Sequence, residues 1–349
     1  MWKFIALAAV LASPALADTR LDMHIGGRTL KDATGWSYQW PAVYFESRFT
    51  GDTVTLKFDD PSNNLNIVVD GRIVAIVKKP GKTEHRLDHL GAGEHTVRLE
   101  KRSETQYATG RFEGFFVPEK AAALPAPAYA RQIEFIGDSL TVGYGNTSPY
   151  NDCTPEEVFE TTDTQQGFGP LIAKHFKAAY RVNAFSGLGM VRNYGGFEHP
   201  KYRMPMLYPR AIYDEIQADS SPWTPQIIIT GIGGNDFSTP VKTGEPWKSQ
   251  AELKADYVKT YTAFVKNLRA KNPRAFLIVA VADGRGDYTD GTREVYEAIK
   301  ASGDTRIGYA TIPETKGGSC YHPNTRDDAA IAKMYIDYIS ARPELWQGK

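Results

Sequence analysis

The sequence of 349 residues has no excess of charge of either sign, because 41 lysine and arginine residues balance 41 aspartate and glutamate residues. A neutral chain has no long-range attraction for nucleic acid or for an anionic membrane surface, so we expect neither as a partner. Beyond the first residues, the chain also has no apolar run long enough to cross a bilayer. These absences predict a globular protein without a membrane span.

Cysteine is scarce, since Cys153 and Cys320 are the only two in the chain. The N-terminal stretch "MWKFIALAAVLASPALA" has one lysine, a short apolar run and an A-x-A site. This pattern is typical of a secretory signal peptide, here residues 1–17, cleaved near Ala17. We therefore expect a secreted or periplasmic protein, in which the two cysteines can form a disulfide. Two buried free thiols are the alternative.

Two catalytic motifs are missing. No G-x-S-x-G nucleophile elbow occurs, and no H-x-x-H or similar closely spaced pair of metal ligands is present. A zinc-dependent deacetylase is therefore disfavoured, and we expect neither a metal nor another cofactor.

Residues 18–118 alternate between apolar and polar positions, as strands do. In "VYFESRF", Val43, Phe45 and Phe49 fall on one face, and Asp70-Gly71 separates two β-branched runs. Many short strands with turn residues between them predict an all-β sandwich. The proline- and alanine-rich residues 119–131 then predict a stiff linker rather than a packed element.

Residues 132–349 change to a strand-then-helix rhythm. Five apolar strands are predicted at residues 132–137, 180–186, 225–232, 275–282 and 306–312, and helical spacing is clearest at 250–272 and 325–341. Alternating βα units predict an α/β domain of three layers, with a parallel sheet covered by helices on both faces. Binding sites in such sheets lie beyond the carboxyl ends of the strands.

Four segments follow those strands and carry polar or flexible residues. They are Gly137-Asp138-Ser139-Leu140, "NAFSGLGM" around Gly187, "GIGGND" around Asn235, and "GGSCYHPN" around His322. Each has an ordinary explanation as a helix cap, a turn or a loop residue. We expect the acidic residues Asp138 and Asp236 to bond N–H groups of their own turns.

The order of these segments is more specific than any one of them. Serine after the first strand, glycine after the second, asparagine after the third and histidine before the last helix resemble the SGNH (GDSL) hydrolases. With a sandwich ahead of it, the chain is similar to carbohydrate esterase family two, in which a jelly-roll domain precedes an SGNH esterase. The resemblance implies Ser139 as nucleophile and His322 as general base. It also implies an oxyanion hole formed by the N–H of Ser139, the N–H of Gly187 and the side chain of Asn235.

One departure from the wider pattern concerns what orients His322. SGNH enzymes usually carry an aspartate three residues before the histidine, where this chain has Ser319. Some members of the resembled family use a Ser-His dyad with the ring held by a main-chain carbonyl, and we expect the same here. Asp283 is a weaker candidate for that role. A Cys153–Cys320 bridge could hold the histidine loop in place.

The resemblance implies an esterase acting on an acetylated polysaccharide or oligosaccharide, and we separately expect a monomer. Aromatic residues near the motifs are candidates for stacking on a sugar ring, namely Trp223, Trp247, Tyr194 and Tyr321, although core packing is the favoured explanation for each one taken singly. A short-acyl or lipid ester hydrolase and a non-catalytic glycan-binding protein remain the alternative functions.

Overall fold

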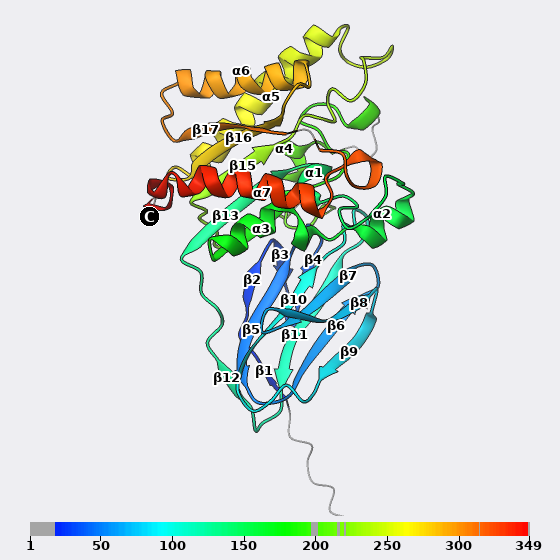
Figure 1. The fold of residues 1–349 in the computed structure, drawn as a ribbon, viewed down its shortest axis with the longest axis vertical. Coiled ribbons are helices and arrows are strands. Elements are labelled where there is room, and N and C mark those ends of the chain that lie inside the picture. Colours follow the sequence, from blue (N-terminus) through cyan, green and yellow to red (C-terminus); the bar gives the residue numbers. More distant parts are fainter. Residues whose placement is uncertain (1–17, 197–201, 215–216, 220, 314, 348–349) are drawn as a thin grey trace, which may run out of the picture.

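The computed structural model describes residues 18–196, 202–214, 217–219, 221–313 and 315–347. The predicted signal peptide, residues 1–17, lies outside the described residues. Two structural units follow each other along the chain, and Figure 1 shows the strand-rich unit beneath the α/β unit.

The first unit is the predicted sandwich, built from two antiparallel sheets of six strands each. One sheet contains β1 (Thr19–Arg20), β3 (Thr29–Lys31), β4 (Trp36–Tyr38), β6 (Val54–Asp60), β9 (Gly81–Leu87) and β11 (Gly110–Val117). The other contains β2 (His24–Gly26), β5 (Tyr44–Thr50), β7 (Asn64–Val69), β8 (Arg72–Lys78), β10 (Glu94–Lys101) and β12 (Ala122–Leu124). Asp70 and Gly71 join β7 to β8 with φ values of 50° and 77°, which is the left-handed geometry of a tight hairpin turn.

The linker prediction is wrong in part, because residues 122–124 form an edge strand. β12 pairs antiparallel with β5, from Ala122 opposite Thr50 to Leu124 opposite Arg48. A strand at the edge of a sheet needs hydrogen bonds on one side only, so three residues of low strand propensity can form one. The composition of this segment therefore did not predict a strand. Residues 125–130 connect β12 to β13 without forming a regular element.

The second unit has the predicted parallel sheet, in the order β14-β13-β15-β16-β17. Its strands are β13 (Arg131–Gly137), β14 (Ala178–Ala184), β15 (Ile227–Gly231), β16 (Phe276–Ala282) and β17 (Ile307–Ile312). The longer helices are α3 (Phe168–His175), α5 (Gln250–Lys271), α6 (Asp287–Ala301) and α7 (Thr325–Ser340). Shorter elements are α1 (Ser139–Val142), α2 (Pro155–Thr161), α4 (Met204–Leu207), η1 (Thr164–Gln166), η2 (Tyr194–Gly196), η3 (Ser319–Tyr321) and η4 (Pro343–Gln347).

The helices cover both faces of this sheet. In Figure 1, α3 and α7 lie on the side of the sandwich, and α5 and α6 lie on the opposite side. The sheet between them is apolar, and Ile227, Ile228 and Ile229 of β15 are almost completely buried. The three-layer prediction is therefore confirmed.

The two units share a polar interface that fixes their relative positions. Arg28 of the sandwich donates to the Tyr208 carbonyl and, at 3.3 Å, to the carboxylate of Glu134 in β13. The ring of Tyr44 in β5 packs against the ring of Tyr180 in β14, with centroids 4.6 Å apart. Consequently β5 is buried on both faces, which the alternation of apolar and polar residues along it did not predict.

Candidate active site

A cleft of about 1240 Å³ lies at the carboxyl ends of the parallel strands. The sheet order makes β13 the first strand, with β14 on one side of it and β15 on the other, so the winding direction reverses there. Such a switch point leaves a crevice between diverging loops. Ser139 follows β13, Gly187 follows β14 and Asn235 follows β15, and all three line the cleft together with His322.

The structure brings the predicted nucleophile and base together. Nε2 of His322 lies 2.8 Å from Oγ of Ser139, although the two residues are 183 positions apart in the sequence. The other ring nitrogen, Nδ1, lies 3.2 Å from the Cys320 carbonyl oxygen. Since a carbonyl only accepts hydrogen bonds, Nδ1 carries the proton and Nε2 is left to accept from the serine hydroxyl.

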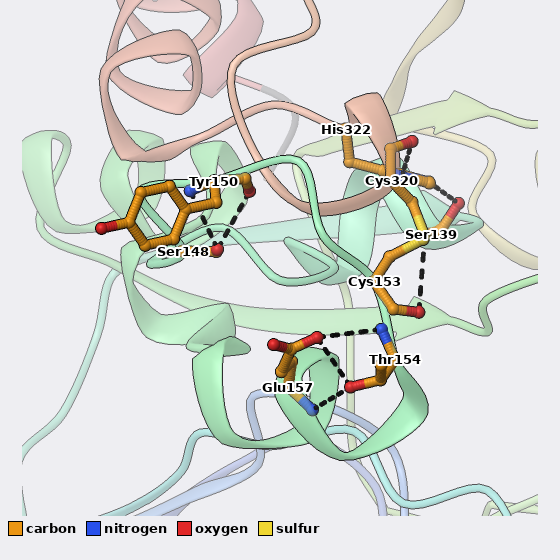
Figure 2. The surroundings of a disulfide bond; sticks show 8 residues. All are labelled: Ser139, Ser148, Tyr150, Cys153, Thr154, Glu157, Cys320 and His322. Atoms are coloured by element: carbon orange, nitrogen blue, oxygen red, sulfur yellow. Dashed lines mark hydrogen bonds between the residues drawn. A yellow bond between two sulfur atoms is a disulfide. The ribbon is translucent and has the colours of Figure 1, made fainter.

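The histidine loop is tied to a distant segment by a disulfide. Cys320 pairs with Cys153, with Cα atoms 5.1 Å apart, and Figure 2 shows this bridge beside Ser139 and His322. The main-chain N–H of Cys320 also donates to the Asn151 carbonyl at 3.0 Å. Cys320 and Tyr321 have φ values of 50° and 59°, a left-handed conformation that side-chain-bearing residues avoid. The bridge and the hydrogen bond thus restrain an unfavourable backbone next to His322.

Burial lowers the pKa of His322 below its ordinary value of 6.5, and the positive charge of Arg285 lowers it further. The centroid of the His322 ring lies 4.8 Å from that of Tyr144, and the two ring planes are tilted by 43°. A neutral imidazole is the form that can accept a proton, so the surroundings favour the basic state.

No carboxylate hydrogen bonds to His322 among the described residues. Ser319, three residues before His322, is fully buried. Asp283 does not reach the ring, because its Oδ1 accepts from the neighbouring Gly284 N–H at 2.9 Å and the residue does not line the cleft. The hydrogen-bond acceptor for Nδ1 of His322 is therefore the Cys320 carbonyl, as expected, and not Asp283.

The predicted oxyanion donors surround Ser139. Gly187 has a left-handed φ of 83°, and a Cβ added there would meet no atom within 4 Å, so its backbone faces open space. Asn235 is buried, and its Nδ2 donates to the Leu188 carbonyl at 2.8 Å and to Oδ2 of Asp138 at 3.3 Å. An oxyanion would therefore compete with the longer and weaker of these two bonds.

Two buried aspartates hold the cleft loops. Asp138 caps α1 by accepting from the Leu140 N–H at 3.2 Å, as predicted, and burial raises its pKa to about 7. The prediction for Asp236 is wrong: it accepts from the N–H groups of residues 190–192, at 2.8–3.0 Å. Asp236 thus ties the loop after β15 to the loop after β14, and burial raises its pKa to about 6.

Two of the four predicted aromatic contacts are not in the cleft. Trp223 precedes β15 and so lies at the amino end of the sheet, where its Nε1 donates to Glu134 at 3.2 Å. Trp247 donates to Asp256 of α5 at 3.0 Å and does not line the cleft either. Both tryptophans are near the third strand in the sequence, but this does not tell at which end of the sheet each one lies.

Tyr194 and Tyr321 do line the cleft, with about 61% and 65% of their surfaces exposed. A third exposed tyrosine, Tyr107, also lines the cleft from the sandwich and was not predicted from the sequence. Residues 104–107 connect β10 to β11 and reach across the domain interface. No motif marks this loop, so only the packing of the two units reveals it.

Two features are absent from the described residues. In these ranges, no three His, Cys, Asp or Glu side chains gather as they would around a metal ion. No helix in the same ranges is long and apolar enough to cross a membrane.

Comparison with known proteins agrees with this architecture. Residues 25–127 match the carbohydrate esterase 2 N-terminal family, and residues 135–333 match the GDSL-like lipase/acylhydrolase family. The chain is 42% identical to an acetylxylan esterase / glucomannan deacetylase of Cellvibrio japonicus, over 97% of this chain and 98% of that protein.

Solved structures extend the similarity. A carbohydrate esterase structure with 41% identity covers 94% of this chain and all of its own, with a TM-score of 0.88. A family two carbohydrate esterase from Clostridium thermocellum, solved with cellohexaose, shares the fold at 24% identity, with a TM-score of 0.80, over 93% of this chain and all of its own. The chain therefore belongs to carbohydrate esterase family two and is a carboxylic ester hydrolase with a GDSL-like domain.

Proposed function

We propose that this carbohydrate esterase removes O-acetyl groups from polysaccharides such as xylan or mannan, through an acetyl-enzyme intermediate on Ser139. The observation that carries the proposal is the 2.8 Å contact between Ser139 Oγ and His322 Nε2 inside the cleft. The name of the 42% identical relative, acetylxylan esterase / glucomannan deacetylase, supports the substrate class.

In the first half of the reaction, Ser139 Oγ attacks the acetyl carbonyl carbon while its proton moves to Nε2 of His322. A serine hydroxyl is a weak nucleophile until a base removes its proton. The carbonyl oxygen becomes negative and is stabilised by the N–H groups of Ser139 and Gly187 and by the Asn235 amide. Among the described residues, neither of those two N–H groups has a protein acceptor, so both are free to donate to it.

The tetrahedral intermediate then collapses, and the C–O bond to the sugar breaks. Nε2 of His322 gives its proton to the leaving sugar oxygen, which departs as a hydroxyl. Water repeats the sequence on the acetyl-enzyme: it loses a proton to Nε2, and the acetyl–Oγ bond breaks. Acetate leaves, and Ser139 recovers its proton. The Cys320 carbonyl holds the ring in the required tautomer throughout.

The size and lining of the cleft favour a polysaccharide over a lipid. A volume of about 1240 Å³ greatly exceeds that of an acetyl group and leaves room for sugar rings. Tyr107, Tyr194 and Tyr321 expose aromatic faces that can stack on such rings. The sandwich contributes to substrate binding through Tyr107.

We also propose that the protein is exported as a monomer to the periplasm or the medium. The predicted signal peptide at residues 1–17 and the Cys153–Cys320 disulfide both suit an oxidising compartment. N-terminal sequencing of exported protein should begin near Asp18, and sedimentation should give a mass close to that of one chain.

Acetate release from acetylated xylan, mannan and bacterial glycans tests the function directly. Ser139→Ala should lower the rate by about four powers of ten or more, because nucleophile and base act as a unit. Ser302→Ala, at an exposed serine that ends α6, is the matched control and should keep full activity. A long-chain ester cleaved faster than every glycan would favour the lipid hydrolase, and glycan binding without acetate release would favour the non-catalytic alternative.

A further inference from the structure

The loop of residues 104–107 does more than line the cleft, because two of its side chains hold one residue of the catalytic domain. Oε1 of Glu104 accepts from the main-chain N–H of Ser186 at 2.8 Å. Nε2 of Gln106 donates to the main-chain carbonyl of Ser186 at 3.0 Å and to Oε1 of Glu104 at 3.2 Å. Both polar groups of the Ser186 backbone are therefore bound by the sandwich.

The Ser186 carbonyl belongs to the same peptide group as the Gly187 N–H. In a trans peptide the carbonyl and the N–H point in opposite directions from a rigid plane. A donor that fixes the direction of the Ser186 carbonyl therefore also fixes the direction of the Gly187 N–H. Gln106 is that donor, and it belongs to the other domain.

Glycine makes this restraint necessary. With no Cβ, Gly187 tolerates both its observed φ of 83° and negative values, so this peptide group could rotate without a steric penalty. A rotated group would turn the N–H away from the oxyanion and present a carbonyl oxygen in its place. Such a rotation would also break the bond to Gln106.

We infer that Gln106 is a positioning residue for catalysis, by which the sandwich aims the Gly187 N–H at the oxyanion. This inference rests on the proposed function, in which that N–H stabilises the tetrahedral intermediate. A carbonyl that accepts a hydrogen bond also polarises its peptide group and strengthens the N–H as a donor. Gln106 therefore improves both the direction and the strength of the oxyanion contact.

The orientation of the Gln106 amide is set by its neighbours. The Ser186 carbonyl and the Glu104 carboxylate are both acceptors, so the NH₂ end must face them. The loop itself is anchored by Gln39, whose Nε2 donates to the Gln106 carbonyl at 3.1 Å and whose Oε1 accepts from Tyr213 N–H at 2.9 Å. The positioning group is thus held from both domains.

The test compares Gln106→Met with Gln165→Met. Methionine keeps the approximate length of glutamine and removes the donor. Gln165 also bridges the two units, donating to the Ala42 and Lys101 carbonyls at 3.3 and 3.1 Å, but it does not line the cleft. The measurements are kcat and KM for 4-nitrophenyl acetate, the rate of inactivation by a 4-nitrophenyl phosphonate, and Tm. Both reagents react at Ser139 without needing a sugar.

Gln106→Met should lower kcat about tenfold, less than the loss of a whole oxyanion donor, and leave KM within about twofold. Phosphonate inactivation should slow by a similar factor, because the phosphoryl oxygen uses the same N–H groups. Gln165→Met should lower Tm and leave kcat unchanged. Should Gln106→Met fail to fold, Gln106→Leu also removes the donor and adds no charge beside Glu104, so the same loss is expected.

The inference is overturned if the folded Gln106 variant keeps kcat within about twofold of wild type, or if Gln165→Met loses as much. An active Ser139→Ala protein would instead remove the proposed function itself, so the two failures are distinguishable.

Discussion

The two sides of the cleft are built by different means. The serine side consists of Ser139, Gly187 and Asn235, each in the loop that follows one of three adjacent parallel strands. The histidine side consists of residues 318–324, an irregular segment between β17 and α7. The parallel sheet places the three residues of the first side next to one another, whereas a disulfide, a main-chain bond to Asn151 and the cap of α7 position the second.

The histidine side also shows which group orients the ring of the proposed base. A buried aspartate would orient the imidazole and stabilise its charged form. Here the Cys320 carbonyl orients the ring, and its own position depends on the bridge to Cys153. Orientation is therefore retained, and the full negative charge beside the ring is absent.

The largest effect is expected on the serine side. Asn235→Ala removes one proposed oxyanion donor and should lower kcat by about 10²- to 10³-fold. Asn272→Ala is the matched control, since its side chain also bonds a main-chain carbonyl, that of Leu268, far from the cleft at the end of α5. Turnover of Asn235→Ala close to wild type would exclude it from the oxyanion hole.

The next largest effect is expected when the disulfide of the histidine side is removed. Cys153→Ser with Cys320→Ser should lower kcat about tenfold, because the carbonyl that orients His322 loses its restraint. The free energy of unfolding should fall by about 2–5 kcal/mol, as for the loss of other disulfides that close long loops. Steady-state kinetics and urea unfolding measure the two quantities.

A second double variant distinguishes the effect of the backbone conformation at residue 320 from the effect of losing the disulfide. Cys153→Ser with Cys320→Gly also lacks the bridge, but glycine adopts the left-handed φ of residue 320 without penalty. It should recover part of the lost kcat relative to the serine pair. Equal activity of the two double variants would show that backbone conformation at residue 320 does not limit catalysis.

A smaller effect concerns substrate contacts at the mouth. Tyr321→Ala should raise KM for acetylated xylan about three- to tenfold, since stacking on one sugar ring contributes roughly 1 kcal/mol. Trp223→Ala should leave this KM unchanged, because Trp223 lies at the amino end of the sheet. KM for 4-nitrophenyl acetate, which has no sugar, should stay constant in both variants.

The smallest effect is a shift in pH dependence. The lowered pKa of His322 keeps it neutral to a lower pH than an ordinary histidine, so kcat/KM should fall on acidification with a midpoint below 6.5. Asp138, on the serine side, has a raised pKa of about 7. A midpoint near 7 that disappears in Asp138→Asn would assign the pH dependence to the serine side and contradict the prediction.

Much of the fold could be predicted because it depends on local patterns. Apolar runs gave the five parallel strands, and the predicted helix at 325–341 matches α7, with Ile331, Tyr335 and Ile339 buried. The short strand β12 was missed because an edge strand of three residues needs little propensity of its own. The burial of both faces of β5 was missed because the second face packs on another domain.

Some residues of the candidate site could likewise be predicted from the sequence, and others could not. Ser139, Gly187, Asn235 and His322 carry a motif order that the sequence displays, and the structure places all four around one cleft. Trp223 and Trp247 lay near the third strand in sequence, which does not reveal the end of the sheet at which a side chain lies. The loop of residues 104–107 has no motif, since its contribution exists only where two domains meet.

The sequence by itself determined the two fold classes, the residues able to react and the family, because strand periodicity and short motifs are written in neighbouring residues. Only the tertiary structure decided which groups meet: the serine with a histidine 183 positions away, Cys320 with Cys153, and Gln106 of the sandwich with Ser186. The physical reason is that hydrogen bonds and disulfides act over a few ångströms. Which residues come that close is set by the packing of whole sheets and domains.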